Sequence, residues 1–114
     1  MATQTASGTQ TATLDTEHTL HTVITTAGTY MLYVDITNLV AGDRVVIRTK
    51  VEIDASGTNL VTLYEDVMIG EDRVGMGQTN LYYVPPVPIV DRITFTLEQT
   101  DGTGRAFDWQ ILEV

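Results

Sequence analysis

The sequence predicts an all-β fold, an antiparallel β-sandwich of about seven or eight strands in jelly-roll or Greek-key order. Apolar and polar residues alternate with period two in successive segments, which is typical of half-buried strands. Turn residues separate these segments at roughly 8- to 15-residue intervals, as in sandwiches and barrels. The 20 threonines add β-branched side chains that favour strands. The pattern leaves the choice between jelly-roll and immunoglobulin-like topology open.

The N-terminal segment, residues 1–13, contains only alanine as apolar content after Met1 and carries no charge. It predicts a flexible or extended arm that precedes a single sandwich domain over residues 14–114. An extended arm can add a strand to the sheet edge of a neighbouring subunit. Its first residues are therefore candidate subunit contacts: Ala2, Thr3, Gln4 and Thr5.

The first half of the domain predicts three strands, over residues 17–26, 29–37 and 44–53. Ala27-Gly28 forms the first turn, and a polar segment ending in Ala41-Gly42-Asp43 forms the second. The strand over 29–37 has the clearest alternation. Its inward face is Tyr30, Leu32, Val34 and Ile36, and its outward face is Met31, Tyr33, Asp35 and Thr37.

The second half predicts four strands, over residues 60–69, 79–84, 90–99 and 106–114. The strand over 60–69 loses its alternation near Glu65-Asp66, where a β-bulge would restore it. Prolines cannot donate to a sheet ladder, so the prolines from Pro85 to Pro88 are expected to end the strand over 79–84. The large rings of the last two strands are expected in the core: Phe95, Phe107 and Trp109.

The two adjacent tyrosines, Tyr82 and Tyr83, point to opposite faces of their strand, so one of them faces outward. An exposed tyrosine beside Pro85 and Pro86 suits a subunit contact or a surface that stacks on sugars. These four residues complete the set of candidate contacts.

The charge balance excludes several classes of partner. The 114-residue chain has 15 acidic and 6 basic residues, a net charge of -9 and one lysine, which argues against nucleic acid. It has no run of about 18 apolar residues, so we expect no membrane partner. It has no apolar leader, so we expect synthesis in a host cytoplasm. The absence of cysteine excludes disulfides and thiolate metal sites.

Residues that could perform catalysis or bind metal are sparse. His18 and His21 are expected to lie on opposite faces of a strand, which argues against a shared metal ion. Serine occurs only at Ser7 and Ser56, so a Ser-His-Asp site is not expected. The loop carboxylates lack a calcium-loop spacing, and although two of them could form a glycosidase pair, acids on a small sandwich are expected to be solvated loop and outer-face charges. We therefore expect no enzyme activity, no cofactor and no metal.

The C-terminal stretch ITFTLEQTDGTGRAFDWQILE, residues 93–113, resembles the ending of small structural proteins encoded by tailed bacteriophages. The Pro85–Pro88 segment and the Ala27-Gly28-Thr29-Tyr30 opening share this resemblance, which covers about residues 18–114. It implies a β-sandwich capsid cement, or decoration, protein on the outer surface of the virion. Such a protein bridges neighbouring subunits of the major capsid protein, and capsid symmetry favours a homotrimer. A tail, fibre or head–tail connector component and a carbohydrate-binding module stay open as alternatives.

Overall fold

Eight β-strands run through the part of the chain that the computed structural model describes, which is residues 2–24, 28–53, 59–70, 80–89 and 91–114. This confirms the predicted all-β fold. The strands are β1 (Thr3–Thr11), β2 (Glu17–Ile24), β3 (Gly28–Asp35), β4 (Arg44–Glu52), β5 (Leu60–Ile69), β6 (Leu81–Ile89), β7 (Arg92–Asp101) and β8 (Ala106–Glu113).

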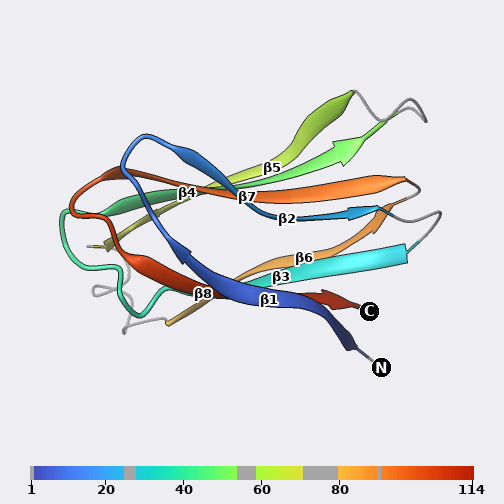
Figure 1. Ribbon diagram of the computed structural model, residues 1–114, viewed down its shortest axis with the longest axis horizontal. Coiled ribbons are helices and arrows are strands. Elements are labelled where there is room, and N and C mark those ends of the chain that lie inside the picture. Colours follow the sequence, from blue (N-terminus) through green and yellow to red (C-terminus); the bar gives the residue numbers. More distant parts are fainter. Residues whose placement is uncertain (1, 25–27, 54–58, 71–79, 90) are drawn as a thin grey trace.

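The strands form two antiparallel sheets that lie as two layers (Figure 1). Sheet A has the order β1-β8-β3-β6, and sheet B has the order β2-β7-β4-β5. Consecutive strands cross from one sheet to the other at every connection except that between β4 and β5. This is the double Greek-key order of a jelly roll, so the structure decides between the two topologies that the sequence left open.

The hydrophobic core lies between the sheets and contains the residues predicted to face inward. Phe95, Phe107 and the inward residues of β3 are buried. Trp109 is only half-buried, because it lies beside β1 at the edge of sheet A. A Cβ on its cross-strand partner Gly8 would lie 3.0 Å from the indole, so this glycine makes room for the ring.

The N-terminal segment differs from the predicted arm. Residues 3–11 are extended, but they form edge strand β1 of the sandwich and pair with β8 from Thr3↔Glu113 to Thr11↔Ala106. The next residue, Ala12, is buried in the core and its backbone N–H donates to the Arg105 carbonyl at 2.8 Å. Main-chain hydrogen bonds to β8 hold this segment in the sheet, although its small, uncharged side chains gave no sign of a strand.

The prolines do not end their strand, contrary to the prediction. β6 continues to Ile89, and its register against β3 shifts between the pairs Leu32↔Val84 and Tyr30↔Val87. A bulge therefore accommodates Pro85 and Pro86, and β6 is an edge strand of sheet A, where proline is tolerated.

The predicted bulge in β5 is present, two residues before the expected place. Thr49 pairs with Tyr64 and Lys50 with Thr62, which leaves Leu63 as the additional residue. Because of the bulge, the outward residues before Leu63 and those after it do not belong to one alternating series. The ionic contacts described below depend on this register.

A buried carboxylate holds the loops together at one end of the sandwich. Asp43 is 1% exposed, and Arg105 donates to it through Nε at 2.9 Å while the backbone N–H of Val40 donates at 3.0 Å. Burial opposes its ionisation, but the hydrogen bonds and charge of Arg105 and the Val40 bond lower the pKa of the Asp43 carboxyl. Gly102, at φ +89°, lies against this carboxylate.

Candidate interaction surfaces

The outward side of sheet A carries a row of cross-strand partners that runs over all four strands. Ser7 of β1 pairs with Gln110 of β8, Gln110 with Tyr33 of β3, and Tyr33 with Tyr83 of β6. Residues directly opposite each other in an antiparallel pair share a face. We call this surface, with the outward residues of the adjoining rows, the tyrosine face: Gln4, Ser7, Met31, Tyr33, Leu81, Tyr83, Gln110 and Leu112.

The tyrosine face is uncharged and partly apolar. Tyr83 is 56% exposed and Leu81 is 48% exposed, whereas Met31, Tyr33 and Leu112 are half-buried among their neighbours. The amide of Gln110 donates to Gln4 Oε1 at 2.8 Å and ties β8 to β1. Charged residues in the four strands of sheet A are three carboxylates at the margins: Asp35, Asp108 and Glu113.

An open hollow of about 290 Å³ lies at one end of this face. Tyr33 and Leu81 contribute ring and aliphatic surface to it, and Asp35 and Asp108 contribute carboxylates. Thr37 donates to Asp35 from both its hydroxyl and its backbone N–H, and these bonds lower the pKa of the Asp35 carboxyl. The hollow therefore combines an apolar wall with carboxylate hydrogen-bond acceptors.

The predicted contact residues fall on the two opposite edges of sheet A. Ala2, Thr3, Gln4 and Thr5 are exposed at the β1 edge, while Tyr83, Pro85 and Pro86 are exposed at the β6 edge. The structure therefore places them on one sheet without joining them into one cluster. The residues that connect the two edges, Met31, Tyr33, Gln110 and Leu112, were not proposed as contacts, although the alternation in 29–37 already placed Met31 and Tyr33 outward.

Tyr82 is the tyrosine of the adjacent pair that faces inward. It is half-buried against the core, and its hydroxyl donates to the Asp66 carboxylate of β5, so it bridges the two sheets. Burial, together with the bond and negative charge of Asp66, raises the pKa of the Tyr82 hydroxyl well above its ordinary value. Tyr82 is therefore a structural residue, and Tyr83 is the one available for contact.

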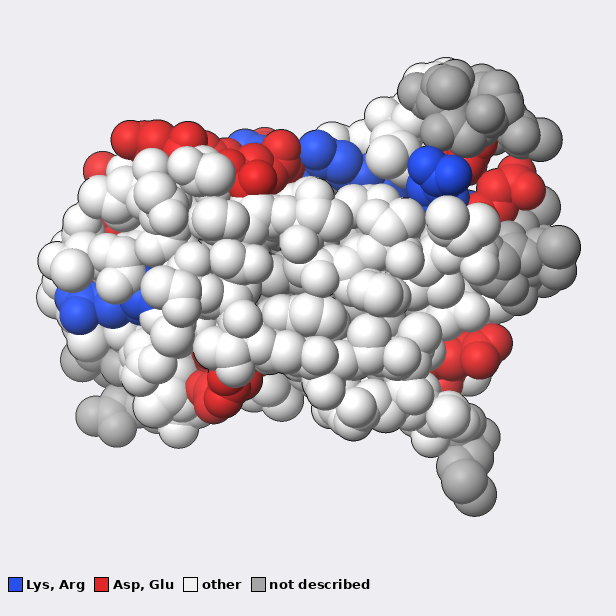
Figure 2. All heavy atoms as spheres, viewed as in Figure 1, with Lys and Arg blue, Asp and Glu red and all other residues white. Residues whose placement is uncertain are grey.

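Sheet B is different, because its four strands contain ten charged residues. Figure 2 shows acidic and basic atoms gathered along the side of the molecule formed by sheet B, with a largely uncharged surface below. At its centre lies a network that we call the ionic cluster: Glu17, Arg48, Lys50, Glu65, Thr96 and Glu98.

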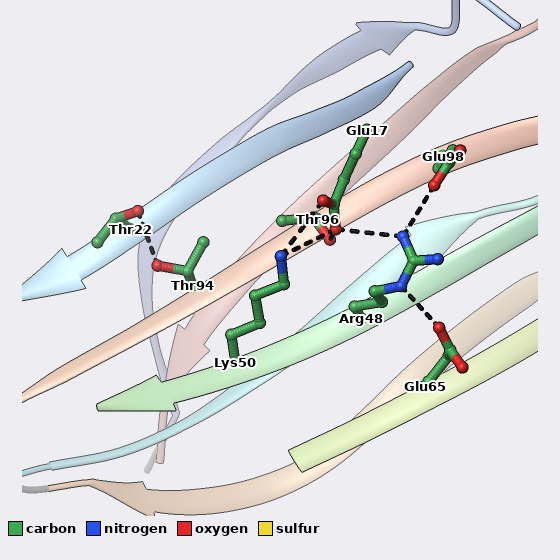
Figure 3. Close-up of polar contacts among 8 residues, drawn as sticks. All are labelled: Glu17, Thr22, Arg48, Lys50, Glu65, Thr94, Thr96 and Glu98. Atoms are coloured by element: carbon green, nitrogen blue, oxygen red, sulfur yellow. Dashed lines mark hydrogen bonds and ion pairs between the residues drawn. The ribbon is translucent and has the colours of Figure 1, made fainter. Parts of the chain in front are cut away.

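Arg48 holds the ionic cluster together (Figure 3). Glu17 and Glu98 are direct cross-strand partners, an arrangement that is destabilising for like charges. Arg48 Nη1 lies 2.9 Å from Glu98 and 3.2 Å from Glu17, and Arg48 Nε lies 2.7 Å from Glu65 Oε1. One guanidinium of β4 thus pairs with carboxylates from β2, β7 and β5.

The electrostatics agree with this geometry. The hydrogen bonds that Arg48 donates to Glu98 and Glu65 raise the pKa of Arg48 above its ordinary value. Partial burial opposes ionisation of Glu17, but the Thr96 hydroxyl at 2.7 Å and the Lys50 ammonium at 3.1 Å lower the pKa of that carboxyl. The charged residues of the ionic cluster are therefore paired with one another. Sequence reasoning missed it because the pairing depends on strand order and register.

Both histidines face inward, contrary to the prediction. The register of β2 against β7 shifts between Thr19 and His21, and this bulge brings His18 and His21 to the same side. They nevertheless have separate contacts, because His18 Nε2 accepts from the Thr13 backbone at 3.0 Å and His21 stacks on Trp109. Among the described residues, no group of three histidines or carboxylates is arranged to hold a metal ion.

Comparison with known proteins found no matching family model, curated protein or solved structure. Within the described parts of the chain there is also no helix whose length and apolar content would let it cross a membrane. Any functional conclusion therefore depends on the surfaces themselves and on the resemblance of residues 18–114.

Proposed function

We propose that the protein is a structural component of a phage virion, of the capsid cement type, and that it binds the outer head through the tyrosine face. It bridges neighbouring subunits of the major capsid protein and self-associates as a trimer around local threefold positions. This function needs a stable small domain, many copies and an interface, and requires no reaction chemistry.

The observation that carries this proposal is the composition of the tyrosine face. Protein interfaces are enriched in tyrosine and methionine and depleted of charge at their centre, with polar residues at the rim. The tyrosine face has this composition, because Tyr33, Tyr83 and Met31 are uncharged residues of the enriched types. Gln4 and Gln110 lie beside them as amides that can both donate and accept hydrogen bonds. The surrounding carboxylates, Asp35 and Asp108 among them, fit the role of a polar rim.

The phage assignment is supported by the resemblance of residues 93–113, which comprise most of β7, the turn that follows and β8. The jelly-roll order is compatible with it, since this architecture is common in viral capsid proteins, although the same fold also serves lectins. The fold therefore agrees with the proposal without selecting it.

Purified particles of the phage that encodes the chain provide the test. We expect the protein at high copy number on intact heads, where quantitative mass spectrometry gives its ratio to the major capsid protein. Tens of copies or fewer would favour the tail, fibre or connector role. Recovery of the protein only as a free species in the infected cell would overturn the proposal.

A carbohydrate-binding module is the second candidate, favoured by the hollow at the end of the tyrosine face. Tyr33 supplies a ring and Asp35, Asp108 and Gln110 supply hydrogen-bonding groups, the combination that orients a small polar ligand. A glycan array distinguishes the two functions. Binding that disappears in Tyr33→Ala would support the carbohydrate reading, and a silent array would count against it.

A further inference from the structure

Strand β5 is an edge strand whose composition is that of an interior strand. Six of its ten residues are large apolar residues that are between 38% and 47% exposed: Leu60, Val61, Leu63, Tyr64, Val67 and Ile69. Apolar residues on both faces are characteristic of strands that are covered on both sides. In this chain β5 pairs with β4 along one edge only, and the sheet order gives its other edge no described neighbour.

The apolar residues of β5 lie on both of its faces because of the register with β4. Val67 pairs with Val46 on the outward side, whereas Val61 pairs with Val51 on the inward side. β6, the edge strand of the opposite sheet at this end, meets β5 through the Tyr82–Asp66 bond. Figure 1 shows the beginning of β5, at the upper right, bent away from the body of the sandwich. Neither face of β5 is therefore well covered.

The other three edge strands carry features that discourage pairing with another chain. β6 contains Pro85, Pro86 and Pro88, which lack a backbone donor, and a bulge. β1 has no large apolar residue, and Ile24 is the one large apolar residue of β2 with high exposure among the described residues, so both edges offer little apolar surface to another strand. β5 also contains a bulge, but it has no proline, and unlike β1 and β2 it exposes six large apolar residues.

The charge of β5 indicates what kind of strand it accepts. Glu65 and Asp66 lie near the middle of the strand, which has no basic residue, and the Glu65 side chain is 53% exposed despite its contact with Arg48. A twofold β5–β5 pair centred on the strand would bring Glu65 near its copy on the outward side and Asp66 near its copy on the inward side, and each copy carries a net charge of -9. A partner strand with basic residues at its middle removes this conflict.

We propose that the edge of β5 that has no neighbour among the described residues binds an extended segment of another protein, which adds to sheet B as a fifth strand. Main-chain hydrogen bonds along β5 supply part of the affinity. The segment has apolar residues at alternating positions, which cover the exposed residues of β5, and lysine or arginine opposite Glu65 and Asp66. This site is separate from the tyrosine face and does not depend on the phage assignment.

Two synthetic ten-residue peptides test the charge requirement against the full chain. Both alternate valine and threonine, one with two lysines at its middle and the other with two glutamates there. Fluorescence anisotropy with labelled peptides should show the lysine peptide binding about tenfold more tightly, and Glu65→Gln should reduce this preference. Equal affinity for both peptides, or no binding at millimolar concentration, would overturn the proposal.

A matched pair of variants locates the binding edge. Ile69→Thr on β5 and Ile24→Thr on β2 make the same change on the two edge strands of sheet B, and threonine keeps a high strand propensity. We expect Ile69→Thr to weaken the lysine peptide about fivefold and Ile24→Thr to leave it unchanged. Equal effects of the two variants would contradict the assignment to β5. So would concentration-dependent dimerisation that Ile69→Thr abolishes, because the occupant would then be a second copy of the chain.

Discussion

The outward faces of the two sheets have the same β-architecture and opposite chemistry. On sheet B, Arg48 and Lys50 pair with carboxylates from the neighbouring strands, so these cations have their partners within the chain. On sheet A, the strands contain no basic residue, and Tyr33 and Tyr83 lie at the centre of an uncharged surface. The difference indicates a division of roles, in which sheet B stabilises its own strand order and sheet A is suited to bind another surface.

The largest expected effect is on binding through sheet A. Tyr83→Ala should weaken attachment to phage heads about 30-fold, equivalent to about 2 kcal/mol, because an exposed interface tyrosine contributes at this level. Lys50→Ala on sheet B is the control, with unchanged attachment. Titration of heads stripped of the protein measures both affinities. If Lys50→Ala were the more damaging variant, the assignment of the two faces would be reversed.

The next effect is on stability and is specific to sheet B. Arg48→Met retains most of the aliphatic stem but leaves Glu17, Glu65 and Glu98 without their shared cation. Unfolding in urea should show a loss of about 1.5 kcal/mol, between the values for exposed and buried ion pairs, because the Arg48 side chain is 23% exposed. Tyr83→Ala should change stability by less than about 0.5 kcal/mol. Equal losses of stability in Arg48→Met and Tyr83→Ala would contradict the proposed difference between the two faces.

Acid should act on the same ionic cluster. The folded-state pKa of Glu17 is lowered, so its contribution to stability is present above its unfolded pKa and is lost as pH falls through the folded value. The free energy of unfolding, measured by urea titration from pH 7 down to pH 3, should therefore fall. In Glu17→Gln this free energy should fall less, by a few tenths of a kcal/mol. A Glu17→Gln curve parallel to that of the wild type would show that this carboxyl contributes no pH dependence.

The smallest effect separates the faces by ionic strength. Salt at 1 M shortens the screening length to about 3 Å, so the stability difference between wild type and Arg48→Met should shrink. Attachment through the tyrosine face should be nearly unaffected, since Tyr33 and Tyr83 are uncharged. Strong weakening of attachment at high salt would indicate that charged residues, and not the tyrosine face, make the contact.

Alternation along the chain was sufficient to predict most of the fold. It placed Tyr30, Leu32 and Val34 in the core and Tyr33 outward, because side chains on a strand alternate strictly between its faces. It failed where pairing partners decide the outcome. The main-chain bonds of β8 convert a bland N-terminal segment into β1, and an edge position lets β6 continue through Pro85 and Pro86.

The surfaces were less predictable than the fold. The bulge between Thr19 and His21, which puts both histidines on one face, was not predicted, although the three-residue spacing of the buried Leu20 and Val23 interrupts the alternation there. The ionic cluster needs the register that sets Arg48 opposite Glu65, and the tyrosine face needs the register that sets Tyr33 opposite Tyr83. Partners that are distant in sequence become visible only when strand order and register are known.

The most direct measurement is an image of the assembled particle at a resolution that shows the orientation of the two sheets. The predicted result is a jelly roll in many copies on the head, with the tyrosine face against the capsid shell and the ionic cluster of Arg48 exposed to solvent. Heads without the protein, or copies that meet the shell through the outward side of sheet B, would contradict the proposal.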